Sequence, residues 1–170
     1  MAMAVVATAD AGLRAARRAT IVQLRAPGMS ARELEANALE LVASSPVPVL
    51  ISSRCDVALA AGAAGVNLPE RDISVSDARA LLGQRLIGRS VHSLQGARDA
   101  EKEGADFVIF GPVWASQSHA DSAPAGIDAL KEVAAALRIP VLAIGGVTEN
   151  RIAECHAAGA AGYAAIGLFQ

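Results

Sequence analysis

Eight short apolar runs recur along the 170-residue chain, and they constrain its fold more than any other feature. They occupy residues 4–8, 20–24, 47–51, 65–68, 85–91, 106–110, 140–144 and 162–166. The runs are continuous rather than alternating, which is typical of parallel strands covered on both faces. Helical patterns separate them, so the sequence predicts eight strands joined by seven helices.

The segment SARELEANALELVASS is the clearest helical pattern. Ser30 and Glu33 match a capping box, and Leu34, Leu41 and Val42 are spaced for one buried face. Three later helices end at a glycine, where the chain must turn left-handed before the next strand. These glycines are Gly62, Gly104 and Gly159.

Eight successive parallel units favour a (β/α)8 TIM barrel, formed as a single domain by residues 1–170. No GxGxxG motif follows the first run, which argues against an open doubly wound sheet. The sequence stops at Gln170, just after the eighth run, so we expect a shortened barrel that lacks the final helix. The missing cover beside strands one and eight should expose apolar surface, and we therefore expect a homo-oligomer.

Composition narrows the class of partner. The net charge is −2, and one Trp, one Tyr and three Phe are too few for a base-stacking surface, so we expect a small-molecule ligand and no nucleic acid. No apolar run approaches the ~18–20 residues that span a bilayer, and the first residues do not match a signal peptide. Cys55 and Cys155 match no metal or redox spacing. We expect a cytoplasmic protein with two buried thiols and no metal or cofactor.

Polar residues follow several predicted strands, at the ends where TIM barrels hold their chemistry. His92 ends the fifth strand, on the same side as Ser90 and over the barrel mouth. This position favours a functional histidine over a merely packed one. Gly145 and Gly146 precede a predicted helix start, where bare backbone amides would hold a phosphate. A tight strand-to-helix turn would need the same two glycines, and spacing alone does not separate these interpretations.

The segment GPVWASQSHADSAPAGID, which begins at Gly111, is longer than a connection needs to be. It is rich in small polar residues, as a lid would be. Its Trp114 either walls the site or plugs the rim of the barrel.

The motifs together resemble the thiamine phosphate synthase/TenI superfamily. The resemblance rests on VQLRAPGMSARELEANALEL, DVALAAGAAGVNL, GRSVHSLQGARDAEKEGADFVIFGPV, IPVLAIGGVTEN and GYAAIGLF, which occur in the family's order over nearly the whole chain. It implies a barrel independently of the strand count.

The synthase branch joins a pyrimidine diphosphate to a thiazole phosphate, and its pattern includes groups for diphosphate and Mg²⁺. Ala26 and Pro27 replace an acid and a lysine of that pattern, and Ser53 replaces one of two aspartates, whereas Asp72 matches the other. The loop pattern Thr-x-Thr-Lys has become residues 116–119, without the lysine. Because lysine and carboxylate-held Mg²⁺ neutralise a diphosphate leaving group, these departures argue against synthase activity.

The tautomerase branch carries a histidine in the segment that reads GRSVHS here. The resemblance then implies that His92 moves protons while a carboxylated thiazole phosphate becomes aromatic. We therefore interpret the chain as a thiazole tautomerase, an isomerase that binds a small phosphorylated thiazole. A thiamine phosphate synthase and a non-catalytic phosphate-binding relative are the alternatives.

This interpretation assigns a role to each candidate residue. His92 is the catalytic acid–base group, and Arg25 or Arg54 would meet the carboxylate of the ligand. The expected substrate-binding residues are Gln23, Arg25, Ser53, Arg54, Asn67, Ser90, Ser116, Ser118 and His119. The expected phosphate-binding residues are Gly145, Gly146, Ile166 and Gly167.

Overall fold

The computed structural model describes residues 1–115 and 123–170, and its strands and helices alternate along the chain. The strands are β1 (Ala2–Val6), β2 (Ile21–Leu24), β3 (Val49–Ser52), β4 (Gly65–Leu68), β5 (Leu86–Val91), β6 (Phe107–Phe110), β7 (Val141–Ile144) and β8 (Gly162–Ala165). The α-helices are α1 (Ala9–Ala15), α2 (Ala31–Ser44), α3 (Cys55–Ala60), α4 (Val75–Leu82), α5 (Leu94–Lys102), α6 (Gly126–Ala136) and α7 (Glu149–Ala157).

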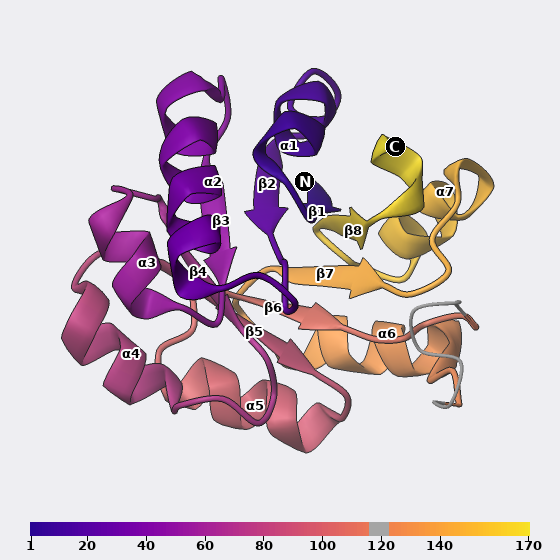
Figure 1. Cartoon of the computed structure of the whole chain (residues 1–170). Helices are drawn as coiled ribbons and strands as arrows, with labels where there is room; N and C mark the ends of the chain where they lie inside the picture. Colours follow the sequence, from indigo (N-terminus) through magenta and orange to yellow (C-terminus); the bar gives the residue numbers. More distant parts are fainter. Residues whose placement is uncertain (116–122) are drawn as a thin grey trace.

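The eight strands form a closed parallel barrel in chain order, and the helices surround it (Figure 1). Closure comes from β1 and β8, which pair in parallel with Ala2 opposite Tyr163. The predicted TIM barrel is therefore confirmed. After β8 the chain forms only a short 3-10 helix, η2 (Gly167–Phe169), whose Phe169 ring stacks on Tyr163 with 6.3 Å between centroids.

Two apolar layers explain why the predicted strands read as continuous apolar runs. Alternate residues of each strand point into the barrel and out toward the helices. The residues inside the barrel are Met3, Val5, Ile21, Leu50, Phe107, Ile109, Leu142 and Ala164. The outer layer lies between the strands and the helices and includes Val22, Ile51 and Val108 from the strands and Leu41 and Leu130 from the helices. Both faces of each strand are thus buried.

The local signals in the sequence form as expected. Ser30 and Glu33 make the capping box of α2, with Ser30 N donating to Glu33 Oε2 at 2.8 Å. The three junction glycines all adopt positive φ. The hydroxyl of Ser93 caps the start of α5, directly after the tip of β5.

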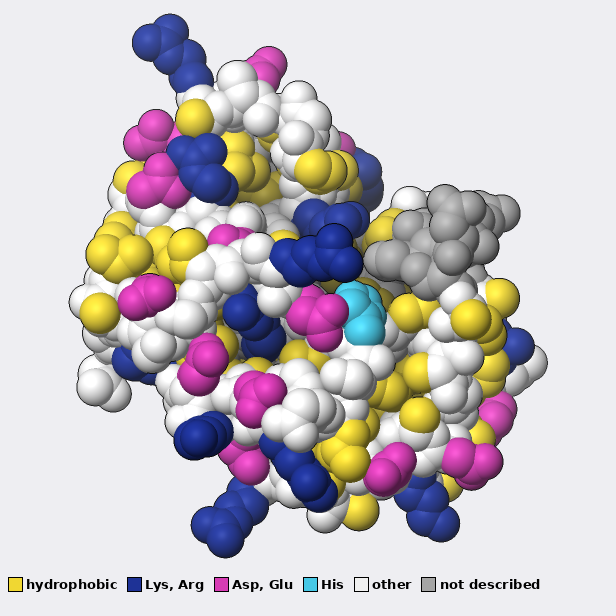
Figure 2. Space-filling view, turned by 90° about the horizontal axis from the view of Figure 1, so that it is seen from below, with side chains coloured by type: hydrophobic (Ala, Val, Ile, Leu, Met, Phe, Trp, Pro, Cys, Tyr) yellow, Lys and Arg dark blue, Asp and Glu magenta, His cyan; other side chains and the backbone are white. Residues whose placement is uncertain are grey.

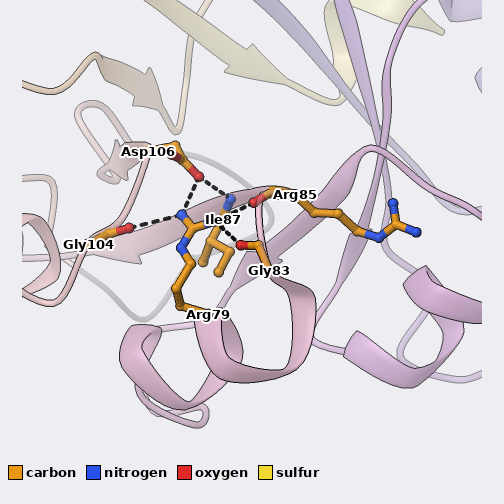
Figure 3. A network of polar contacts seen from close by, with 6 residues as sticks. All are labelled: Arg79, Gly83, Arg85, Ile87, Gly104 and Asp106. Carbon is orange, nitrogen blue, oxygen red and sulfur yellow. Dashed lines mark hydrogen bonds and ion pairs between the residues drawn. The ribbon is translucent and has the colours of Figure 1, made fainter.

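An arginine network ties the outer layer together where β5 and β6 begin (Figure 3). Arg79 of α4 donates to the carbonyls of Gly83, Arg85 and Gly104 and pairs with Asp106 at 2.7 Å. Asp106 also accepts from the amide of Ile87 at 2.7 Å. This network lies at the end of the barrel opposite the strand tips.

Across the two described ranges, none of the helices combines the length and the apolar character needed to cross a bilayer.

Candidate active site

A pocket of about 150 Å³ opens at the carboxyl ends of the strands. Its lining residues are Val5, Gln23, Arg25, Ser52, Asn67, Pro69, Glu70, Ser90, His92, Ile109, Gly111, Pro112, Ile144, Gly145 and Ile166. Figure 2 shows a face of the molecule on which a histidine and an acidic side chain lie together near the centre, with basic side chains close by. Six predicted site residues and the predicted catalytic histidine therefore meet in one pocket.

Two polar side chains are buried in the lining of the pocket, beside the apolar Val5 and Ile109. Gln23 and Asn67 are each only 3% exposed, although they carry amide side chains. Asn67 Nδ2 donates to Ser90 Oγ at 3.0 Å, and Asn67 Oδ1 has no partner among the described residues. Buried polar atoms in proteins are nearly always hydrogen-bonded, so this layer is suited to receive a ligand with its own polar groups.

His92 is held by two hydrogen bonds at the rim of the pocket. Its ring Nδ1 donates to the Gly111 carbonyl, and its backbone amide donates to Glu70 Oε1 at 3.1 Å. With Nδ1 protonated, a neutral ring leaves Nε2 as the acceptor. The imidazole is therefore oriented at the mouth with one nitrogen free of that bond.

Glu70 is a pocket residue that the sequence analysis missed. Its carboxylate lines the cavity beside His92. Its position in the sequence could have indicated this, because Glu70 comes two residues after the end of β4, where barrels of this type hold their functional residues.

Asp72 and Ser53 lie together beside the mouth but outside the pocket lining. Ser53 Oγ donates to Asp72 Oδ2, and the amide of Ile73 donates to Asp72 Oδ1 at 2.8 Å. Ser53 has a φ of 70°, the left-handed region that non-glycine residues rarely adopt. The two positions that the family pattern fills with aspartates are thus adjacent here, as one carboxylate and one hydroxyl.

The two candidate arginines differ in their surroundings. Arg25 lines the pocket, whereas Arg54 is absent from the lining and pairs with Asp56, at 2.8 Å from Nε and 2.5 Å from Nη2. The hydrogen bond from Arg54 is the main cause that lowers the pKa of Asp56 from 3.8 to about 2. Arg54 therefore lies outside the pocket lining, with its guanidinium engaged by Asp56, and its contact with a ligand stays a prediction.

The glycine pair after β7 is needed for close packing. A Cβ on Gly145 would lie 2.5 Å from Pro112 Cβ, and one on Gly146 would lie 2.7 Å from Trp114 Cβ. The Gly146 carbonyl accepts from Arg151 Nη1 at 2.7 Å. The tight-turn interpretation thus has direct structural support, and Gly145 alone of the pair lines the pocket.

The remaining predicted positions fall into two groups. Ile166 lines the pocket, but Gly167 does not. Ser116, Ser118 and His119 lie outside the described residues.

Trp114 is partly buried against the apolar layer between the strands and the helices, and it is not part of the pocket lining. The guanidinium of Arg151 lies over its ring, 4.9 Å from the centroid. In this conformation Trp114 therefore does not wall the pocket.

Comparison with known proteins places this barrel in a family. The family model described as "Thiamine monophosphate synthase" matches residues 3–169. The chain belongs to this family. The superfamily resemblance noted in the sequence is therefore confirmed, together with an enzymatic role in thiamine biosynthesis.

Individual relatives carry the same name. The chain is 39% identical over 152 residues to a thiamine-phosphate synthase of Chloroflexus aurantiacus, covering 87% of this chain and 70% of the relative. It is 41% identical over 161 residues to a thiamine-phosphate synthase of Methanoculleus marisnigri, covering 92% and 76%. The solved thiamine phosphate pyrophosphorylase of Pyrococcus furiosus superposes with a TM-score of 0.89 at 29% identity, covering 98% of this chain and 84% of that one.

These relatives overturn the tautomerase interpretation and its isomerase class, and they favour the synthase alternative. The error came from treating each departure from the synthase pattern as a loss of function. Mg²⁺ commonly binds through only one or two protein carboxylates, because substrate phosphates and water supply the other oxygens. Replacing one aspartate by Ser53 therefore does not by itself exclude Mg²⁺ binding.

The residues at Asp72 provide suitable donors for Mg²⁺. Carboxylate and hydroxyl oxygens are hard ligands, and Asp72 and Ser53 present both at the same point of the mouth. The described part of the chain has no group of three or more His, Cys, Asp or Glu side chains that could hold a metal alone. This donor set suits an ion that arrives bound to a diphosphate rather than an ion fully enclosed by protein.

Proposed function

We propose that this protein is a thiamine-phosphate synthase, which transfers a pyrimidine from its diphosphate to a thiazole phosphate. The observation that carries the proposal is the match with synthases over nearly the whole barrel, at 39–41% identity. The mouth of the barrel agrees with it chemically, because Arg25 lines a pocket that contains two buried amides, and the Asp72–Ser53 pair lies beside this pocket.

The chain's own residues would bind and orient the two substrates. The buried amides of Gln23 and Asn67, with the hydroxyl of Ser90, offer donors and acceptors to a heteroaromatic ring. Arg25 offers a guanidinium to phosphate oxygens, a pairing that is strong because both groups are charged. The apolar walls Val5, Ile109 and Ile144 would exclude water from the reacting carbon.

Asp72 and Ser53 would hold Mg²⁺ at the rim. When bound, the ion supplies positive charge to the departing diphosphate. Holding the two substrates side by side in one pocket would also raise the reaction rate, because they would no longer have to meet in solution in the correct orientation.

The backbone at Gly145 and Ile166 is proposed to hold the phosphate of the thiazole. Both residues line the pocket after β7 and β8, where barrels of this type commonly bind phosphate. Gly146 and Gly167 are proposed to complete this site only if the backbone adjusts on binding, because neither lines the pocket in the present conformation.

The test is a coupled assay with the pyrimidine diphosphate, the thiazole phosphate and Mg²⁺. We expect thiamine phosphate and pyrophosphate to form in equal amounts, and Asp72→Asn to lower kcat/KM by about 10²-fold or more, as expected when a group that stabilises transition-state charge is lost. Asp99→Asn is the matched control, because Asp99 lies on the surface of α5 and bonds only to Gln95 Nε2 among the described side chains. We expect this variant to match the wild type.

A wild type that binds both substrates without forming product would contradict the proposal and favour the non-catalytic relative. Product formation that is unaffected by Asp72→Asn would leave the transfer reaction intact but remove Asp72 from it.

Self-association remains a prediction for this chain. Sedimentation of the whole chain at several concentrations would measure it. A mass equal to that of one chain at every concentration would contradict the prediction.

A further inference from the structure

Arg89 is a cation that the proposed reaction does not use. It lies on β5 between Gly88 and Ser90, so its side chain points away from the barrel interior. In the pairing of β4 with β5 it stands opposite Leu68, the last residue of β4. It is therefore placed where the loop of residues 69–73 leaves the sheet.

The guanidinium of Arg89 joins the two ends of this loop. Nη1 donates to the Pro69 carbonyl at 3.0 Å and to the Ile73 carbonyl at 2.8 Å. Pro69 is the first residue after β4, and Ile73 directly precedes Ser74, the N-cap of α4. Within the ranges that the structure describes, Arg89 makes no ion pair, and its side-chain hydrogen bonds go to the main chain of this loop.

The loop that Arg89 holds carries both acids of the mouth. Glu70 reaches the tip of β5 through the His92 amide, and Asp72 reaches the hydroxyl of Ser53 after β3. The Pro69 carbonyl, which Arg89 contacts, also accepts from the Asp72 amide at 3.0 Å. A change in the Arg89 contacts would therefore move the backbone that aims both carboxylates.

We propose that Arg89 is a positioning residue for the diphosphate end of the site. It holds the loop of residues 69–73 so that Asp72 meets Ser53 and Glu70 meets His92, and it sets the affinity for metal-bound diphosphate without touching that ligand. The inference rests on the proposed function, because that function supplies the ligand.

Arg79 is a matched control within the same chain. It too donates to main-chain carbonyls from the outer layer, those of Gly83, Arg85 and Gly104, but at the opposite end of the barrel (Figure 3). Loss of either arginine removes bonds to main-chain carbonyls, and loss of Arg79 also removes its ion pair with Asp106. Only Arg89 bonds to a loop that contributes residues to the pocket lining.

The experiment compares Arg89→Met, Arg89→Lys, Arg79→Met and Arg79→Lys in the whole chain. Calorimetry measures the binding of magnesium pyrophosphate, steady-state assays measure kcat and KM for the pyrimidine diphosphate, and hydrogen exchange follows the amides of Asp72 and His92. We expect Arg89→Met to weaken binding and raise KM by about 10-fold or more, as when a group that orients a metal ligand is lost. Exchange at the two amides should quicken, while kcat changes little.

The lysine variant of Arg89 should restore most of the binding, because an ammonium can still donate to carbonyls. The two Arg79 variants should lower the melting temperature and leave the pyrophosphate affinity unchanged. The Arg79 variants therefore show how much a general loss of stability alone changes the pyrophosphate affinity.

Three results would overturn the proposal. Unchanged binding in Arg89→Met would remove Arg89 from the site. If that variant does not fold, unchanged binding in Arg89→Gln, which also lacks the cation, would do the same. Equal weakening in the Arg79 and Arg89 variants would assign the effect to global stability. A wild type that neither binds magnesium pyrophosphate nor forms product would instead defeat the proposed function, and the role of Arg89 with it.

Discussion

Ser53 has an unusual backbone conformation for a residue with a side chain. Its φ of 70° is costly for most L-residues, and such conformations persist where the surrounding structure enforces them, commonly at functional sites. Here the Ser53 amide donates to the Asn67 carbonyl at 3.0 Å, and its hydroxyl donates to Asp72. The conformation therefore links the tip of β3 to the loop that carries Asp72.

Ser53→Asp should make the mouth bind metal more tightly. Aspartate tolerates positive φ better than most residues, and it would place a second carboxylate beside Asp72. We expect a lower melting temperature without Mg²⁺, because the two negative charges repel each other, and a larger rise on adding Mg²⁺ than in the wild type.

Thermal unfolding over a Mg²⁺ titration measures this effect. Ser44→Asp adds the same charge at the exposed end of α2, near the opposite end of the barrel, and should respond to Mg²⁺ as the wild type does. An identical response in Ser53→Asp would show that residue 53 does not approach the ion.

The Arg54–Asp56 pair predicts a pH dependence of stability. The pKa of Asp56 is lowered from 3.8 to about 2, so its favourable interaction is complete above pH 3.8 and is lost as pH falls through 2. The side chains are 40% and 65% exposed, so solvent screening keeps the contribution small. Asp56→Asn should slightly lower urea stability at pH 7, and this difference should shrink between pH 4 and pH 2. A difference that is constant with pH would refute the assignment.

At the scale of elements, β5 packs closely against β6 because Gly88 of β5 has no side chain. A Cβ on Gly88 would lie 2.1 Å from the Phe107 ring and 2.8 Å from Asn67 Oδ1. Gly88→Ala should therefore overpack the barrel interior and lower the free energy of unfolding by about 1–3 kcal/mol. Urea denaturation measures this, and Gly28→Ala is the control, because nothing lies within 4 Å of a Cβ there. An equal effect of both substitutions would contradict the packing argument.

The elements were predictable because their signals are local. Continuous apolar runs reflect burial on both strand faces, and the Ser30–Glu33 capping box needs no distant partner. The polar contacts of the mouth were less predictable. Arg54 was placed in the site because the sequence did not show that Asp56 would engage it, and Glu70 was missed because its contact with His92 joins two different loops.

The function was misassigned because the motifs were compared one residue at a time, without the contacts between elements. Residue-by-residue comparison of a motif counts each substitution as a loss. In the folded mouth Ser53 donates to Asp72 and Arg25 lines the pocket, so residues that lie far apart in the motif comparison come together at one end of the barrel.

At the scale of the whole molecule, the two cysteines report on opening of the barrel. Cys55 begins α3 and Cys155 lies in α7, and burial raises the pKa of both thiols. Because the thiolate is the reactive form, we expect native labelling by a disulfide reagent at pH 8 to be about 100-fold or more slower than for a free thiol. Cys55→Ser and Cys155→Ser assign the two rates. Fast labelling of either cysteine in the native protein would contradict this expectation.

The pairing of β1 with β8 has a consequence for synthesis. Ala2 lies opposite Tyr163, so β1 is synthesised about 160 residues before the strand with which it pairs. At about 5–20 residues per second, the free edge of β1 remains unpaired for roughly ten to thirty seconds on the ribosome. An open strand edge is a template for pairing with other chains, so this interval is when the nascent protein most needs protection from aggregation.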